Sequence, residues 1–168
     1  MTLTASTGKP QTIGAALAGL GMAVTVGTAL GFQHIGGYIP CKLCLEQRIP
    51  YYIGIPVMAL ALVSSLLKLP PLITRGLLLA GALLMTWSLY LGGFHAGVEW
   101  GFWPGPTDCG VVAAPESGGS LLDQLDAVIP PSCDQAAGRF LGLSFAGWNV
   151  VASLFLAAVA YAAAFRKA

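Results

Sequence analysis

Two cysteines, Cys41 and Cys44, stand three residues apart in the segment PCKLCLEQR at positions 40–48, and Arg48 follows four residues after the second cysteine. If the chain is helical from Cys44, Arg48 lies on the same face as that thiol, because residues four apart are neighbours on a helix. The positive end of a helix dipole and a nearby cation both favour the reactive thiolate. The segment therefore has the residue types of a thiol–disulfide exchange site.

Three other uses of a CxxC segment compete with this interpretation. A zinc site needs a second close pair of ligands, whereas the remaining cysteines, Cys109 and Cys133, are 24 positions apart. Covalent haem attachment requires a histidine directly after the second cysteine, where this chain has Leu45. A structural disulfide is the main alternative, but a bridge that closes so short a loop contributes little entropic stabilisation. We favour a redox role and expect no metal site.

The composition places this segment in a membrane protein. Of 168 residues, 56% are hydrophobic and only 9% are charged, and the mean hydropathy is +0.76, whereas soluble domains carry about 25% charged residues. The net charge of +1 provides no electrostatic footprint for nucleic acid. A crossing of the lipid bilayer takes about 20 apolar residues, and four such segments are present. The sequence predicts an all-α membrane protein, a four-helix transmembrane bundle forming a single domain over residues 1–168, with helices at about 13–32, 49–67, 72–94 and 145–165.

The first apolar segment is longer than the core of a signal peptide and lacks a convincing cleavage site, so we interpret it as a retained helix. Gly27 and Gly31 form a GxxxG pattern on it, which predicts close packing against another helix.

Charge predicts the orientation. All seven acidic residues lie in the predicted loops 33–48 and 95–144, whereas five of the eight Lys and Arg residues lie on the opposite side. An excess of Lys and Arg marks the cytoplasmic side of a membrane. We therefore expect both termini in the cytoplasm and both loops outside, in the periplasm. All four cysteines lie in these loops, in a compartment where disulfides persist.

The second loop contains a short amphipathic pattern. Ser120 and Asp123 resemble a capping box, and the apolar residues of 121–129 recur at helical spacing. About ten residues cannot span a membrane, so we expect a short helix lying flat on the outer surface. Cys109 and Cys133 flank this segment, and a disulfide between them would be exposed and exchangeable.

His34 and His95 fall at the outer ends of the first and third predicted helices. Each can lie at the interface, ligate a haem or donate to a quinone carbonyl, and the aromatic surroundings of His95 better suit a planar ligand. Trp100, Phe102 and Trp103 follow it; we favour a membrane anchor over a quinone lining for these aromatic residues.

Several motifs together resemble the DsbB (disulfide bond formation protein B) family: FQH ahead of PCKLCLEQR, the late cysteines 109 and 133, and FLGLSFAGWN before the fourth helix. The resemblance extends from about residue 13 to residue 165. It implies an inner-membrane protein dithiol:quinone oxidoreductase, which reoxidises a periplasmic DsbA-like thioredoxin-fold oxidase and passes the electrons to ubiquinone or menaquinone.

The resemblance also implies roles for individual residues. Cys109 would be attacked by the reduced partner, and Cys133 would be its pair, later linking to Cys41. Cys44 would be the thiolate beside the quinone, with Arg48 polarising a quinone oxygen and His95 close to the ring. Two residues depart from the family pattern: Lys42 lies between the cysteines, and Gln47 precedes the arginine where some members have an acid.

Three rivals to this function remain. A vitamin K epoxide reductase-like protein also couples a CxxC to a quinone, but its redox cysteines belong near the end of the bundle. A membrane scaffold with structural disulfides and a haem-binding bundle that uses His34 and His95 are the others.

Overall fold

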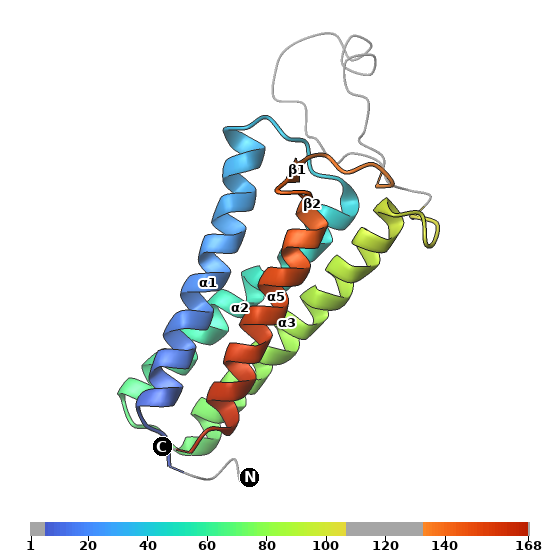
Figure 1. The fold of residues 1–168 in the computed structure, drawn as a ribbon. Helices are drawn as coiled ribbons and strands as arrows, with labels where there is room; N and C mark the ends of the chain where they lie inside the picture. The colour runs from blue at the N-terminus through green and yellow to red at the C-terminus, as the bar shows by residue number, and fades with distance from the viewer. Residues whose placement is uncertain (1–5, 107–132, 168) are drawn as a thin grey trace.

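The structure, a computed structural model, describes residues 6–106 and 133–167. Within these residues the chain forms four long helices and one two-stranded hairpin (Figure 1): α1 (Lys9–His34), α2 (Lys42–Leu66), α3 (Pro71–Glu99), β1 (Arg139–Phe140), β2 (Leu143–Ser144) and α5 (Phe145–Phe165). All four helices are long and apolar enough to cross a membrane. The predicted all-α transmembrane bundle is confirmed, while the predicted short helix at 120–129 lies outside the described residues.

Helices α1, α2 and α3 extend beyond their predicted ends, and the extensions of α2 and α3 position candidate residues. Helix α2 begins at Lys42 rather than near residue 49, and α3 continues to Glu99 rather than ending at 94. Hydropathy marks the apolar part of a helix, whereas backbone hydrogen bonding continues into the polar residues at its ends. As a result, Cys44 lies in the first turn of α2, and His95 lies inside α3 rather than in a loop.

A tight turn leads into the last helix. Leu141 and Gly142 join β1 to β2 with φ angles of 52° and 84°, as a two-residue hairpin turn of the mirror-image type requires. The Oγ atom of Ser144 then accepts a hydrogen bond from the backbone N–H of Gly147, 3.2 Å away, and caps α5. The hairpin thus sets where α5 enters the bundle.

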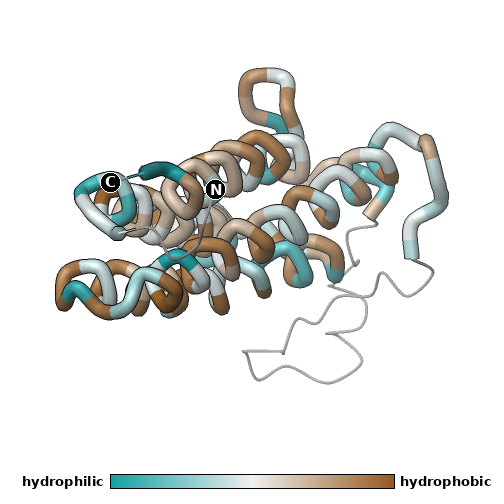
Figure 2. The backbone as a smooth tube through the Cα atoms, turned by 90° about the horizontal axis from the view of Figure 1, so that it is seen from below, coloured by the Kyte–Doolittle hydropathy of each residue, from teal (hydrophilic) through white to brown (hydrophobic). Residues whose placement is uncertain are grey.

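The helices pack closely through small residues and methionines. Helix α3 packs most extensively against α5 and α2, and α1 packs against α2 and α5. Met22, Met58 and Met85 are completely buried, and the first two lie directly against Gly54 and Gly81 on neighbouring helices. A flexible thioether fills the space that each missing side chain leaves. Hydrophobic stretches run along each helix in Figure 2, as expected for surfaces that face lipid.

The predicted close packing at Gly27 and Gly31 is wrong. A side chain at either position would meet nothing within 4 Å. Gly14 lies instead against Ala163 of α5, and Gly21 lies against Leu156. Several neighbours of these two glycines on α1 line a cavity, and the contact of this outer part of α1 with α5 is made by the ring of Phe32 against Phe145.

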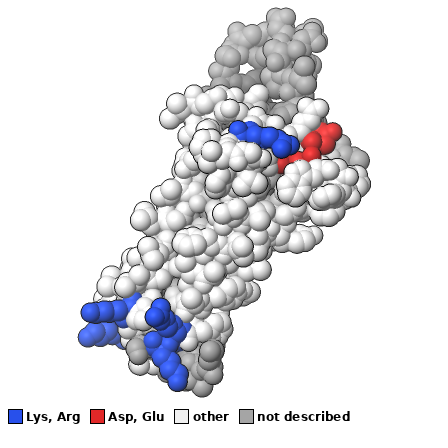
Figure 3. All heavy atoms as spheres, viewed as in Figure 1, with Lys and Arg blue, Asp and Glu red and all other residues white. Residues whose placement is uncertain are grey.

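At the end of the bundle that carries both termini, a buried arginine satisfies the last carbonyl groups of α5. Arg75 is 1% exposed and donates to the backbone oxygens of Ala164, Arg166 and Ser6. The Nε2 atom of Gln11 also donates to the oxygens of Ala163 and Arg166, at 3.0 and 2.8 Å. These donors supply partners that a helix C-terminus lacks within itself. Blue Lys and Arg atoms gather at this end in Figure 3, whereas the opposite end shows red acidic atoms with blue atoms beside them.

The packing at Gly14 predicts a position-specific loss of stability. A methyl group in Gly14→Ala would overlap Ala163, and overpacking of this kind costs about 1–3 kcal/mol. Gly27→Ala makes the same chemical change on the same helix in open space, so we expect it to be neutral or slightly stabilising. Thermal unfolding of the detergent-solubilised protein measures the difference; equal melting temperatures for the two variants would contradict the packing.

Candidate active site

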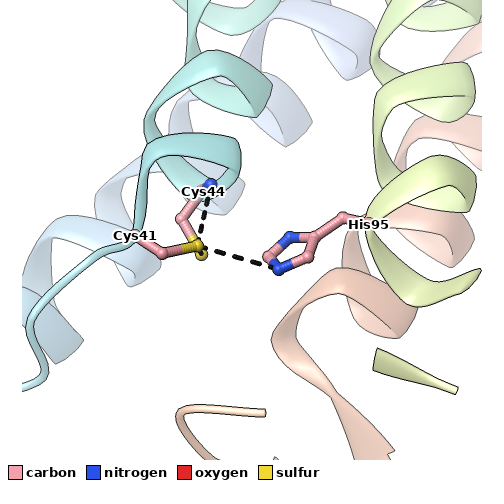
Figure 4. Close-up of side chains that lie close together, drawn as sticks. All are labelled: Cys41, Cys44 and His95. Atoms are coloured by element: carbon pink, nitrogen blue, oxygen red, sulfur yellow. Dashed lines mark hydrogen bonds between the residues drawn. The ribbon is translucent and has the colours of Figure 1, made fainter. Parts of the chain in front are cut away.

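The two cysteines of the CxxC segment are free thiols in contact at the start of α2. Cys41 is the residue that caps the helix, and Cys44 lies in its first turn. Their sulfur atoms are 3.2 Å apart, and the backbone N–H of Cys44 donates to the sulfur of Cys41 over 3.4 Å. Figure 4 shows both thiols pointing toward His95 of α3. The pair is reduced and positioned to form a disulfide.

Cys41 is the thiol that this arrangement favours as the thiolate. The hydrogen bond with the Cys44 side chain, assisted by His95 and the Cys44 backbone N–H, lowers the pKa of Cys41 to about 4, although burial acts in the opposite direction. The sequence led us to expect the helix dipole to act on Cys44. Because α2 begins at Lys42, Cys41 occupies the capping position instead, where the unpaired N–H groups of the first turn point.

His95 and Glu99 lie beside the thiol pair on the last turns of α3. The Nε2 atom of His95 is 3.7 Å from the sulfur of Cys41 and 3.8 Å from Oε1 of Glu99. The side chains of both residues are 3% exposed. Oε2 of Glu99 is buried and has no hydrogen-bond partner among the described residues. A histidine and a carboxyl group are thus enclosed with the thiols.

Behind His95, three polar side chains form a buried chain of hydrogen bonds across α2 and α5. The Nδ1 atom of His95 is 2.7 Å from Nε2 of Gln47, and Oε1 of Gln47 accepts from Nδ2 of Asn149 over 2.8 Å. Oδ1 of Asn149 in turn accepts from the hydroxyl of Tyr51 over 2.7 Å. We did not assign a role to these three residues from the sequence. The available signal was the presence of Gln47 and Asn149 near apolar spans, because polar residues at membrane depth face the bundle interior.

Cys133 lies next to Cys41. It is 3% exposed, is disulfide-bonded, and packs in one apolar cluster with Cys41, Leu43 and Val98. The cluster brings Cys133 against the first turn of α2, which places a disulfide-bonded sulfur beside the CxxC pair. Cys109, the remaining predicted catalytic cysteine, lies outside the described residues.

An apolar cavity of about 450 Å³ opens on the other side of Cys44. Its walls come from α1, α2 and α5, together with segment 38–40 and residues near β1, and Cys44 and Arg48 both line it. The guanidinium of Arg48 donates to Oε1 of Gln33, which also lines the cavity. An apolar cavity with a few convergent polar groups is typical of a site for a small organic ligand.

The quinone contact of His95 stays a prediction, and the structure gives His95 other neighbours. His95 is not among the residues that line the cavity; it contacts Cys41 and Gln47 instead. Trp100, Phe102 and Trp103 do not line it either, and they are 58%, 68% and 43% exposed, which suits an anchor at the membrane interface. His34 is exposed at the last turn of α1.

A metal-binding use of the thiols is also visible in the geometry. The two sulfur atoms and a ring nitrogen of His95 lie within 4.8 Å of one another. A structural zinc site closes with four ligands, and this group among the described residues provides three. The arrangement fits a redox pair with a neighbouring histidine better than a closed zinc site.

The contacts of Cys41 predict how the reduced protein titrates. With Cys109 and Cys133 replaced by serine, the ultraviolet absorbance of the thiolate should be present at pH 7 and disappear as the pH falls through about 4. Cys44→Ala removes the side chain whose hydrogen bond does most to lower the pKa of Cys41, so the absorbance should then be lost at a higher pH. A midpoint near the ordinary cysteine value of about 8.5 in both proteins would contradict the assignment.

The chain was compared with known proteins. The family model of disulfide bond formation protein DsbB matches residues 11–163, which is most of the chain. No curated protein and no solved structure matches it. The family match, four helices able to span a membrane and a paired CxxC at one end of the bundle agree with one another. The chain therefore belongs to the DsbB family, the membrane oxidoreductases of disulfide bond formation.

Proposed function

We propose that the protein is a dithiol:quinone oxidoreductase of the bacterial inner membrane, which reoxidises a DsbA-like thioredoxin-fold partner in the periplasm. The observation that carries the proposal is the position of Cys44, which contacts Cys41 on one side and lines the apolar cavity on the other. One residue thereby joins a thiol-exchange site to a site for a lipid-soluble acceptor. The positive charge at the end with both termini supports a cytoplasmic position for the termini and a periplasmic one for the cysteines.

Electrons enter through the late loop. The thiolate of the reduced partner attacks Cys109, forming a mixed disulfide and releasing Cys133 as a thiolate. Cys133 attacks Cys41 in the Cys41–Cys44 disulfide, which forms the Cys41–Cys133 bond and releases Cys44. The short distance between loops that this requires is supported by the shared cluster of Cys41 and Cys133.

The following steps release the oxidised partner and re-form the disulfide between Cys109 and Cys133. The second thiol of the partner attacks the mixed disulfide, so the partner leaves oxidised and Cys109 is released as a thiolate. Cys109 then attacks Cys133 and frees Cys41. The result is a free Cys41–Cys44 pair with Cys133 in a disulfide, and the described residues have this combination.

A quinone in the cavity, either ubiquinone or menaquinone, supplies the ability to take up two electrons and two protons as it becomes a quinol. Cys44 lies in the cavity wall, and Cys41, 3.2 Å away, completes the new disulfide as the electrons leave. Arg48 provides a fixed cation at the same wall, where it stabilises negative charge on an oxygen of the acceptor. The net reaction converts the partner dithiol and quinone into the partner disulfide and quinol.

Quinone reduction tests this assignment directly. Purified protein mixed with quinone and a reduced thioredoxin-fold dithiol should consume the quinone absorbance, and Cys44→Ser should abolish the turnover. Cys109→Ser should abolish the mixed disulfide with the partner, observed on non-reducing gels. A folded protein that reduces no quinone with any such dithiol would instead favour a structural role for the disulfides.

Filling the cavity should separate acceptor binding from thiol exchange. Ala29 of α1 lines the cavity, so Ala29→Trp should raise the KM for quinone about tenfold or more by occupying the space. Ala23 lies on the same helix, exposed and outside the cavity lining, so Ala23→Trp is the matched control. Disulfide exchange with the partner should remain normal in both variants. Equal KM values in the two variants would place the acceptor elsewhere.

A further inference from the structure

The buried hydrogen-bond chain behind His95 has a single direction, because backbone carbonyls fix both of its amide groups. The Nε2 atom of Gln47 donates to the carbonyl oxygen of Leu43 over 3.2 Å as well as facing His95. The Nδ2 atom of Asn149 likewise donates to the carbonyl oxygen of Ser88 over 3.3 Å. If either amide were flipped, its oxygen would face a carbonyl oxygen. The amide group of each side chain therefore has one fixed orientation.

This direction determines which nitrogen of His95 carries the proton. Since Nε2 of Gln47 is a donor, Nδ1 of His95 at 2.7 Å must accept. In a neutral imidazole the other nitrogen then holds the hydrogen. That nitrogen, Nε2, faces the sulfur of Cys41 at 3.7 Å and Oε1 of Glu99 at 3.8 Å, so the N–H group points toward the thiol pair.

We propose that Gln47 and Asn149 are positioning residues that hold the Nε2–H group of His95 toward Cys41 and so make the Cys41–Cys44 disulfide more oxidising. The proposal deepens the function proposed above. Both residues also line the cavity, so the proposal is tested on the thiol pair in the absence of quinone. Gln47 acts through His95, and Asn149 acts through Gln47, whose oxygen it holds. Neither residue needs to touch a sulfur atom for this effect.

The balanced exchange reaction shows in which direction the His95 donor shifts the redox equilibrium of the Cys41–Cys44 pair. The Cys41–Cys44 disulfide and a reference dithiol yield the reference disulfide, a Cys44 thiol, a Cys41 thiolate and one proton. A donor aimed at the Cys41 sulfur stabilises the product side, because charge-assisted hydrogen bonds are strong. A stabilised reduced form makes a disulfide a stronger oxidant. The hydrogen bonds from Asn149 through Gln47 to His95 therefore favour the acceptance of electrons from the partner by the Cys41–Cys44 disulfide.

The two hydrogen bonds made by residue 47 also explain why an amide side chain suits this position. An amide presents a donor to His95 and an acceptor to Asn149 at the same time. The lowered pKa of Cys41, to which His95 contributes, agrees with a donor at this point. An apolar side chain of the same length would keep the packing but lose both interactions.

Gln47→Met tests the proposal in protein that carries Cys109→Ser and Cys133→Ser, so that Cys41 and Cys44 are the reporting thiols. Equilibration with a reference dithiol, without quinone or partner, should show an equilibrium constant for reduction about tenfold lower than in the parent. For a two-electron couple this corresponds to about 30 mV. The matched control is Gln11→Met. Gln11 is likewise buried and donates to carbonyl oxygens, but it lies at the opposite end of the bundle, so this variant should leave the constant unchanged.

The ring nitrogens of His95 provide a readout that a merely structural role would not move. In ¹⁵N-histidine protein, long-range proton–nitrogen spectra should place the hydrogen on Nε2, and Gln47→Met should produce a mixture of the two neutral forms. His34→Gln assigns the two histidines. Asn149→Ala, a second variant one step further from His95, should shift the constant in the same direction by a smaller factor.

An unchanged equilibrium constant together with an unchanged proton position in the folded Gln47→Met or Asn149→Ala protein would overturn the proposal. A shift in folded Gln11→Met as large as in Gln47→Met would overturn it too. Because no quinone is present, these results are independent of turnover. A shifted constant in a protein that reduces no quinone would support the positioning role while contradicting the proposed function.

Discussion

The hydrogen bond between Gln47 and His95 joins α2 to α3, and the arrangement of the thiols depends on it. In a bundle surrounded by lipid, a buried polar group has no water to replace a missing partner. Gln47 therefore needs partners from other helices, and it finds them on α3 and α5 at once. The same bonds hold an imidazole N–H group against Cys41, so the satisfaction of polar groups and the activation of a thiol share the same side chains.

Cys44 lies between two environments that suit different steps of the reaction. On one side are sulfur, imidazole and carboxyl groups enclosed between α2 and α3. On the other side is an apolar cavity with Arg48 in its wall. Reduction of a lipid-soluble acceptor needs such a division, since the exchanging thiols must be reached from the aqueous loops while the acceptor arrives from the membrane. A short first turn of helix is enough to span both environments.

Small residues make close contacts between helices along the bundle, and at the cavity level Gly92 of α3 lies against Asn149 of α5. Gly14 lies against Ala163, and Met22 and Met58 fill the space beside glycines of neighbouring helices. Buried Arg75 closes the end of the bundle with both termini by binding the last carbonyl groups of α5. These contacts hold the helices together at that end, while toward the other end residues of α1, α2 and α5 line the cavity.

Much of this architecture is readable along the chain. Hydropathy alone indicated four spans, the CxxC segment indicated a redox site, and several motifs together indicated the DsbB family, which the family match confirmed. Helix ends were less accurate, because polar residues such as Glu99 continue a helix beyond its apolar part. The packing of Gly27 and Gly31 was predicted wrongly, because a small-residue pattern does not state which stretch of a helix meets a neighbour.

The sequence by itself determined the number of spans, the polar ends and the presence of a reactive cysteine pair, since these follow from local composition and spacing. Only the tertiary structure decided that His95 contacts Cys41 rather than the cavity, that Cys133 packs beside Cys41, and that Gln47, Asn149 and Tyr51 form one chain. These contacts join residues from different helices, up to 102 positions apart. They depend on how each helix is rotated against its neighbours, and that rotation is set by the packing of small and large side chains across the whole bundle.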